Sequence, residues 1–304
     1  MMLTHRDIIR GLTTDEKRAL TTLSDLAGMR HLLGHIVIIA IFAWINAVST
    51  GGWQIAAMLG QGIAMVFLFT AMHECSHKTA FRTGWINRGV GTIAGFVLFL
   101  LPRWFFYFHQ AHHKFTQDPL RDPELAAPKP ATKAQYLWYL SGVPVWRDHL
   151  SAVIGVAFGR RSDAFVPPLA QAAVQREAIG FMLGYVVLAP VLAYGGYLLQ
   201  FWLVPLLLGQ PFLRLYLLAE HADCAETDNM LVNTRTLATT PVIRFLAWNM
   251  PFHAEHHSFT AVPFHQLPAL HAHIRGKLHV MTAGYTAFHR DYYRNLAGRV
   301  RELF

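Results

Sequence analysis

Charged residues are scarce in this sequence: Asp, Glu, Lys and Arg make up 14% of the 304 residues, whereas 53% are hydrophobic. Soluble domains contain about 25% charged residues, so the composition argues against an ordinary soluble protein and indicates a membrane protein. Cysteine is rarer still, and the two residues present, Cys75 and Cys224, are expected to be free thiols. Residues 1–30 lack the apolar core of a signal peptide, and the chain has no internal repeat or low-complexity run.

Long apolar segments, by contrast, are present in two close pairs. Each approaches or exceeds the ~20 residues that a membrane-spanning helix needs, and only Arg214 carries a formal charge. The pairing predicts two helical hairpins that cross the membrane. The segments are residues 31–50 and 53–72, then 178–200 and 201–219.

Positive charge is absent from the predicted tips of these hairpins. Of the 26 Lys and Arg residues, 5 precede the first hairpin, 12 lie between the hairpins and 8 follow the second. Because basic loops mark the cytoplasmic face, we predict a multi-pass protein of the cell (inner) membrane with both termini in the cytoplasm. The net charge of +8 then reflects topology and contact with membrane lipid, and no nucleic-acid partner is expected.

Histidine is abundant, with 18 residues, and it is clustered in three motifs. These are HECSH at 73–77, HQAHH at 109–113 and HAEHH at 253–257, here called boxes 1, 2 and 3. Residues i, i+3 and i+4 share one face of a helix, so each box directs its imidazoles to one side. His221 follows the fourth apolar segment. The topology brings all of these residues to the cytoplasmic surface of the membrane.

The predicted fold class is all-α integral membrane, with four transmembrane helices as two hairpins, interfacial helices and a cytoplasmic helical cap. Residues 89–101 are apolar but too short to span, so we expect an interfacial or re-entrant segment. Residues 118–133 form a Pro-rich, charged loop. The single domain, 1–304, divides into an N-terminal cytoplasmic segment (1–30), hairpin 1 (31–72), a cytoplasmic and interfacial region with boxes 1 and 2 (73–177), hairpin 2 (178–219) and a cap with box 3 (220–304).

Nine converging imidazoles are too many for one tetrahedral zinc ion, which takes four ligands, and they suit two metal ions. Imidazole binds zinc, copper, iron and nickel alike, so the ligand type does not identify the metal. The setting favours iron, because an apolar helix bundle gives a long hydrocarbon access to the site. Attack on an unactivated C–H bond requires a redox-active metal and O₂.

The order of the boxes, with spans before box 1 and between boxes 2 and 3, resembles the membrane fatty acid desaturase/hydroxylase superfamily over residues 31–275. The resemblance implies two Fe (Fe²⁺/Fe³⁺), O₂ as co-substrate and a lipid or fatty-acyl substrate. No HPGG haem-binding segment is present, so an external donor such as ferredoxin with its reductase would supply electrons. The ligands it implies are His73, His77, His109, His112, His113, His253, His256 and His257, with His221 at the place of a further family histidine.

Several polar residues near the boxes could orient a ligand imidazole through its second ring nitrogen. They are Glu74, Asp118, Asp122, Asn249 and Glu255. We expect His265, His271 and His273 to pack under the cap rather than to support a ligand.

The sequence is also compatible with other functions. A hydroxylase, or an oxidative decarboxylase that forms a terminal alkene, would begin with similar hydrogen abstraction, and the boxes do not separate these reactions from desaturation. HECSH also fits the zinc metalloprotease pattern H-E-x-x-H, with Glu74 as general base. That hypothesis, like a metal-handling or other zinc protein of the membrane, leaves boxes 2 and 3 unexplained.

Overall fold

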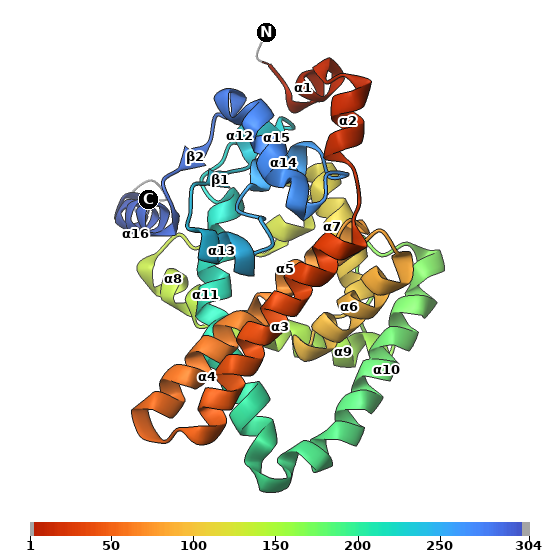
Figure 1. Ribbon diagram of the computed structural model, residues 1–304, viewed down its shortest axis with the longest axis vertical. Coiled ribbons are helices and arrows are strands. Elements are labelled where there is room, and N and C mark those ends of the chain that lie inside the picture. The colour runs from red at the N-terminus through yellow and green to blue at the C-terminus, as the bar shows by residue number, and fades with distance from the viewer. Residues whose placement is uncertain (1–2, 300–304) are drawn as a thin grey trace.

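Four long apolar helices form one end of the molecule. The computed structural model describes residues 3–299, and within this range four helices are long and apolar enough to cross a membrane. The first hairpin consists of α3 (Asp25–Val48) and α4 (Gly51–Val66), and α5 (Leu68–His77) extends α4. The second consists of α10 (Pro168–Ala193) and α11 (Val204–His221). The prediction of an all-α membrane fold with four spans is confirmed, and the turns of both hairpins lie at the bottom of Figure 1.

The turn of the second hairpin lies a few residues earlier than the sequence suggested. It contains η2 (Tyr194–Gly196), in which Gly195 and Gly196 have φ values of +70° and +77°. Glycine reaches this left-handed region without steric cost, so the pair ends α10 there. A π-helical turn, η3 (Leu199–Leu203), then leads into α11.

A sharply bent helix pair separates the two hairpins in the chain. The axes of α6 (Gly84–Val97) and α7 (Pro102–Phe115) differ by 102°, as in a broken span or a re-entrant loop. Pro102 is the first residue of α7, a position where its missing N–H has no cost. The bend agrees with the expectation that residues 89–101 do not form a straight span, and it turns box 2 back toward box 1.

The two hairpins meet where α4 crosses α11. A Cβ atom on Gly62 would lie 1.8 Å from the carbonyl oxygen of Pro205, and one on Gly209 would lie 2.2 Å from that of Gly62. Small residues allow such close backbone approach between membrane helices. Because α5 continues α4 and α11 ends at His221, this crossing fixes box 1 relative to His221.

Polar side chains strengthen the contact between the hairpins near the π-helical turn. Such a turn shifts the backbone hydrogen-bond pattern, and backbone polar groups in a membrane need partners from elsewhere in the protein. Asn46 Nδ2 donates to the Gln200 carbonyl (2.9 Å), and Gln61 Nε2 donates to the Phe201 carbonyl (2.8 Å). Asn46 also donates to Gln61 Oε1 (3.1 Å), so one network joins α3, α4 and η3.

Replacing Gln61 with Leu is therefore expected to lower the free energy of unfolding by about 1 kcal/mol, the usual range for a polar contact between membrane helices. The leucine removes the donor to the Phe201 carbonyl. Thermal unfolding in detergent measures the effect. Gln54→Leu is the control, because among the described residues the Gln54 amide makes one long contact, 3.5 Å to the Asn46 carbonyl oxygen. Equal melting temperatures for the two variants would show that the network does not stabilise the crossing.

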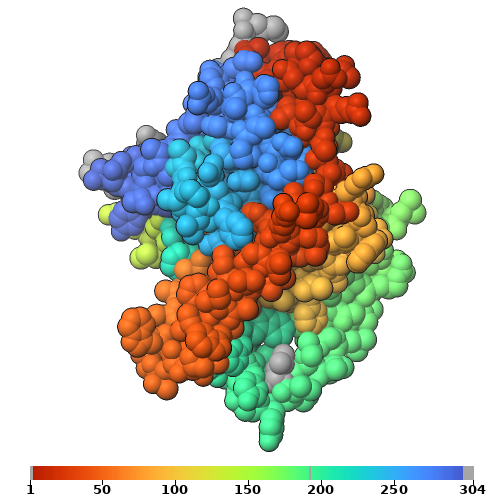
Figure 2. All heavy atoms as spheres, viewed as in Figure 1, coloured from red at the N-terminus to blue at the C-terminus, as the bar shows by residue number. Residues whose placement is uncertain are grey.

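Short elements cover the other end of the bundle, and in Figure 2 the C-terminal segments (blue) form a continuous surface with the N-terminal helices (red). Two short parallel strands, with Thr236 opposite Met281, were not expected in the cap. The remaining helices are α1 (His5–Gly11), α2 (Thr14–Leu20), η1 (Pro123–Ala126), α8 (Lys133–Leu140), α9 (Val143–Ala157), α12 (Met230–Asn233), α13 (Pro241–Leu246), α14 (His253–Ser258), η4 (Phe264–Gln266), α15 (Leu267–Ile274), η5 (Arg275–Lys277) and α16 (Tyr285–Arg299), and the strands are β1 (Thr236–Leu237) and β2 (Met281–Thr282).

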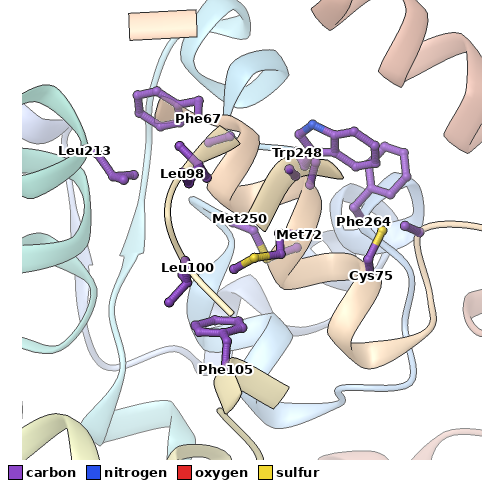
Figure 3. Packing of buried hydrophobic residues seen from close by; sticks show 14 of the residues in the cluster. Phe67, Met72, Cys75, Leu98, Leu100, Phe105, Leu213, Trp248, Met250 and Phe264 are labelled. Carbon is purple, nitrogen blue, oxygen red and sulfur yellow. The ribbon is translucent and has the colours of Figure 1, made fainter. Parts of the chain in front are cut away.

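A buried apolar cluster fastens the cap to the end of α5. Met72 of α5 belongs to the same core cluster as Met250, which precedes box 3 in the chain, and Figure 3 shows the two side chains together. The rings of Trp248 and Phe264 pack with their centroids 4.7 Å apart and are fully buried. This packing holds box 3, on α14, over box 1.

Candidate metal centre

Box 1 lies at the last turn of α5. Lys78, in the left-handed conformation (φ +63°), ends the helix directly after His77. His73 and His77 are one turn apart, so their rings share a face with centroids 5.2 Å apart. His73 is buried and His77 is half-buried. The helix end thus presents two imidazoles at the boundary between span and cap.

The other two boxes also lie on helices that direct their rings inward. Box 2 ends α7, and box 3 makes up most of α14. Their histidines are buried, except for the half-buried His113. His221 is the last residue of α11 and is also buried. The structure therefore brings the ends of α5, α7, α11 and α14 together.

Five imidazoles form a first group: His73, His77, His109, His113 and His256 each offer a ring nitrogen within 4.8 Å of the others. His109 Nε2 lies 2.7 Å from His77 Nε2 and 2.9 Å from His113 Nε2. Two ligand atoms about 2.1 Å from one ion lie roughly 3.0 Å apart at a right angle and roughly 3.4 Å apart at a tetrahedral angle. The nitrogen spacings are close to those of atoms that share one ion.

A second group adjoins the first and contains His112, His221 and His257, again with ligand atoms within 4.8 Å of one another. His221 Nε2 lies 3.2 Å from His112 Nε2 and 3.1 Å from His253 Nε2, which places His253 beside this group. The rings of His113 and His257 stack with centroids 4.0 Å apart. Two groups of donor nitrogens, each compact enough to surround one ion, therefore lie side by side.

The ring nitrogens of the two groups fit the role of metal ligands better than that of hydrogen-bonding groups. Both ring nitrogens of His73, together with His257 Nε2 and His256 Nδ1, are buried without a hydrogen-bond partner among the described residues, although buried polar atoms normally have one. Burial holds the pKa of His253, His256 and His257 well below the usual value. These rings are therefore neutral, the form that binds a metal ion.

Three of these imidazoles have a polar contact at their second ring nitrogen, Nδ1, with a residue outside the two groups. His112 Nδ1 donates to Asp122 Oδ1 at 2.9 Å. His221 Nδ1 lies 3.3 Å from the Asn233 carbonyl oxygen, and His257 Nδ1 lies 3.2 Å from Thr116 Oγ1. Outer contacts of this kind orient a metal-ligating imidazole and set its tautomer. All three rings consequently direct Nε2 toward the interior of the group.

The sequence singled out Asp122 correctly as a possible partner but gave no signal for Asn233 or Thr116. It also missed Glu220, whose Oε1 lies 3.2 Å from His253 Nδ1. Glu220 precedes His221 in the chain, and this position next to a candidate ligand is the one local feature that could have suggested it.

Two of the predicted supporting residues hold the backbone of the cap instead of an imidazole. Glu74 is fully buried and its Oε1 accepts a hydrogen bond from the Phe264 N–H (2.9 Å). Asn249 Nδ2 donates to the Phe264 carbonyl (3.1 Å). Successive helix positions point about 100° apart, so the Glu74 side chain leaves the helix in a different direction from the His73 ring that precedes it.

The other two also contact something other than a boxed ring. Asp118 pairs with Arg121 at the surface. Glu255 is buried, accepts from Thr236 Oγ1 (2.6 Å) and pairs with His271 Nδ1. His271 therefore supports box 3 through Glu255, whereas it was expected only to pack under the cap.

Replacing Asp122 with Asn is expected to weaken metal binding about 10- to 100-fold, the usual effect of losing an outer partner of a ligand. The amide carries no charge and accepts fewer of the hydrogen bonds that hold His112. Titration of the purified protein with Fe²⁺ measures the change. Asp118→Asn, in the same loop but away from the rings, is the matched control, and equal affinities for both variants would contradict the assigned role.

Comparison with known families supplies independent information. The family model described as "Fatty acid desaturase" matches residues 47–289, that is 243 of the 304 residues. The matched range includes all three boxes and His221. A search of curated proteins gave no match.

Proposed function

The chain belongs to the fatty acid desaturase family, and we propose that it is a membrane-bound, di-iron, O₂-dependent oxidoreductase. It acts on C–H bonds of a fatty-acyl or similar long-chain substrate, most simply as a fatty acid desaturase. The observation that carries this proposal is the pair of adjoining groups of buried imidazoles at the ends of the predicted spans.

Each group would hold one iron. The first would be bound by His73, His77, His109, His113 and His256, and the second by His112, His221, His253 and His257. When bound, the two irons supply the reduction of O₂ and the removal of hydrogen from an unactivated C–H bond. The outer partners hold the rings in a fixed orientation, so little reorganisation is needed when the ions enter.

Aromatic side chains line the side of the first group nearest the spans. Phe69 and Phe105 lie against His73, with ring centroids 6.2 and 6.4 Å away, and Phe105 also stacks on His109 at 5.2 Å. Phe105 appears in Figure 3 as part of the buried core. These apolar rings exclude water from the imidazoles and offer a hydrocarbon chain a compatible surface.

The half-buried ligands suggest where electrons enter. His77 and His113 are the least buried of the boxed histidines, and each is followed by an exposed lysine, Lys78 and Lys114. A basic surface of this kind favours association with an acidic partner. We therefore assign electron supply to a separate acidic protein, such as ferredoxin with its reductase, that docks on the cytoplasmic face.

The orientation of Glu74 argues against the zinc protease hypothesis. A general base must lie within hydrogen-bond reach of the proton that it abstracts. Glu74 is instead fully buried and bound to the Phe264 N–H. The peptidase hypothesis also leaves boxes 2 and 3 without a role.

The test is to express the chain with an electron-donor system and compare acyl-lipid and hydrocarbon profiles by mass spectrometry. New double bonds would support a desaturase. Hydroxyl groups or alkenes one carbon shorter would assign hydroxylation or oxidative decarboxylation instead. His113→Ala should abolish any product, and an unchanged profile with iron bound and electrons supplied would contradict a fatty-acyl substrate.

A further inference from the structure

The Pro-rich loop between boxes 2 and 3 folds against the second imidazole group. Residues 118–133 were expected only to form a charged loop, but part of them forms η1 (Pro123–Ala126) directly beside His112. Asp122 caps this short helix, because its Oδ1 accepts from the Glu124 N–H at 2.9 Å. The same Asp122 oxygen accepts from His112 Nδ1, so the loop is fixed to the ring.

This arrangement brings a second carboxylate of the loop to the inner side of His112. Glu124 Oε2 lies 3.4 Å from His112 Nε2. That nitrogen is also the one that faces His221 Nε2, at 3.2 Å. Because Asp122 occupies Nδ1, Glu124 contacts the ring at the nitrogen that is free to bind an ion.

Lys129 fixes the direction of the Glu124 carboxylate. Its ammonium group pairs with Oε1 and leaves Oε2 directed at His112. Both side chains are half-buried, with exposed side-chain fractions of 24% for Lys129 and 28% for Glu124. Removing a carboxylate even partly from water is costly unless it is paired, and Lys129 supplies the compensating charge.

We propose that Glu124 is an oxygen ligand of the second metal position, beside His112, His221, His253 and His257. The inference rests on the proposed function, in which this group holds an ion. The 3.4 Å separation of Oε2 and Nε2 equals the spacing of roughly 3.4 Å between two ligand atoms about 2.1 Å from one ion at a tetrahedral angle. Neutral imidazoles bring no charge to a buried cation, whereas this carboxylate brings one.

The two metal positions then differ chemically. Among the described residues, the first group consists of imidazoles alone. The second combines imidazoles with one carboxylate, a harder ligand. The two ions should therefore give different spectroscopic signals. The binding of the second ion should depend on Glu124, and the binding of the first should not.

The experiment compares the full-length wild type with Glu124→Ala and Glu124→Gln after anaerobic loading with Fe²⁺. Iron content and Mössbauer spectra are measured on detergent-purified, monodisperse protein. We expect about two irons with distinct signals in the wild type, and loss of one signal with at least ~10-fold weaker binding of one ion in both variants. Asp118→Asn, which keeps the loop but changes a carboxylate paired with Arg121, should match the wild type.

Three other results of this experiment would each have a different meaning. A full iron complement with an unchanged spectrum in both Glu124 variants would overturn the assignment and leave the proposed function intact. Loss of both irons from a folded Glu124→Gln variant would overturn it too, because the first group does not include Glu124. A wild type that binds no iron would contradict the proposed function itself.

Discussion

Replacing His109 with Ala is expected to remove iron from the first group and to reduce product formation by more than about 100-fold, beyond the 10- to 100-fold typical of losing only an outer partner. His109 is central to this group, because its Nε2 contacts the Nε2 atoms of both His77 and His113. The substitution removes one donor nitrogen. It also removes the ring that contacts both His77 and His113. Iron content and mass-spectrometric product analysis should be measured on the same preparations.

The matched control for this prediction is His273→Ala. His273 is an exposed residue of α15 outside the two imidazole groups. It should leave iron content and product formation at the wild-type level. Equal losses in both variants, or a fully iron-loaded and active His109→Ala, would contradict the assignment of the first group.

Replacing Gly62 with Leu is expected to have the largest effect on stability. The first side-chain carbon would lie 1.8 Å from the Pro205 carbonyl, a distance that forces α4 and α11 apart. Overpacking typically costs 1–3 kcal/mol and sometimes more, and here the obstacle is backbone that cannot move aside. The yield of monodisperse protein and the melting temperature should both fall sharply.

Gly89→Ala tests whether this effect is specific to the crossing. A Cβ on Gly89, in α6, would meet no atom within 4 Å. Alanine favours helix over glycine by about 1 kcal/mol, so this variant should be as stable as the wild type or slightly more stable. A Gly62→Leu protein that melts like Gly89→Ala would mean that α4 and α11 do not cross so closely.

The spans and boxes were predictable because their signals are local. Apolar runs of about 20 residues with at most one charge identify membrane helices, and the i, i+3, i+4 spacing of each box sets the direction of its rings. His221 could be added because it directly follows a span. These features needed no knowledge of which distant segments meet.

The outer partners of the rings could not be predicted in the same way. Asn233 and Thr116 reach His221 and His257 through contacts between separate elements, and no sequence pattern marks them. Proximity in the chain was also misleading: Glu74, within box 1, and Asn249, shortly before box 3, both bind the backbone of Phe264. The π-helical turn and the paired strands likewise depend on long-range contacts.

The proposed function requires that the nine histidines hold two iron ions. The most direct test is the metal content and Mössbauer spectrum of the wild type, purified from cells grown with iron and then reduced. We predict about two irons per chain with histidine-rich ligation, since imidazole suits iron and each group of histidines could hold one ion. A single zinc ion per chain, with no iron taken up on reconstitution, would contradict it.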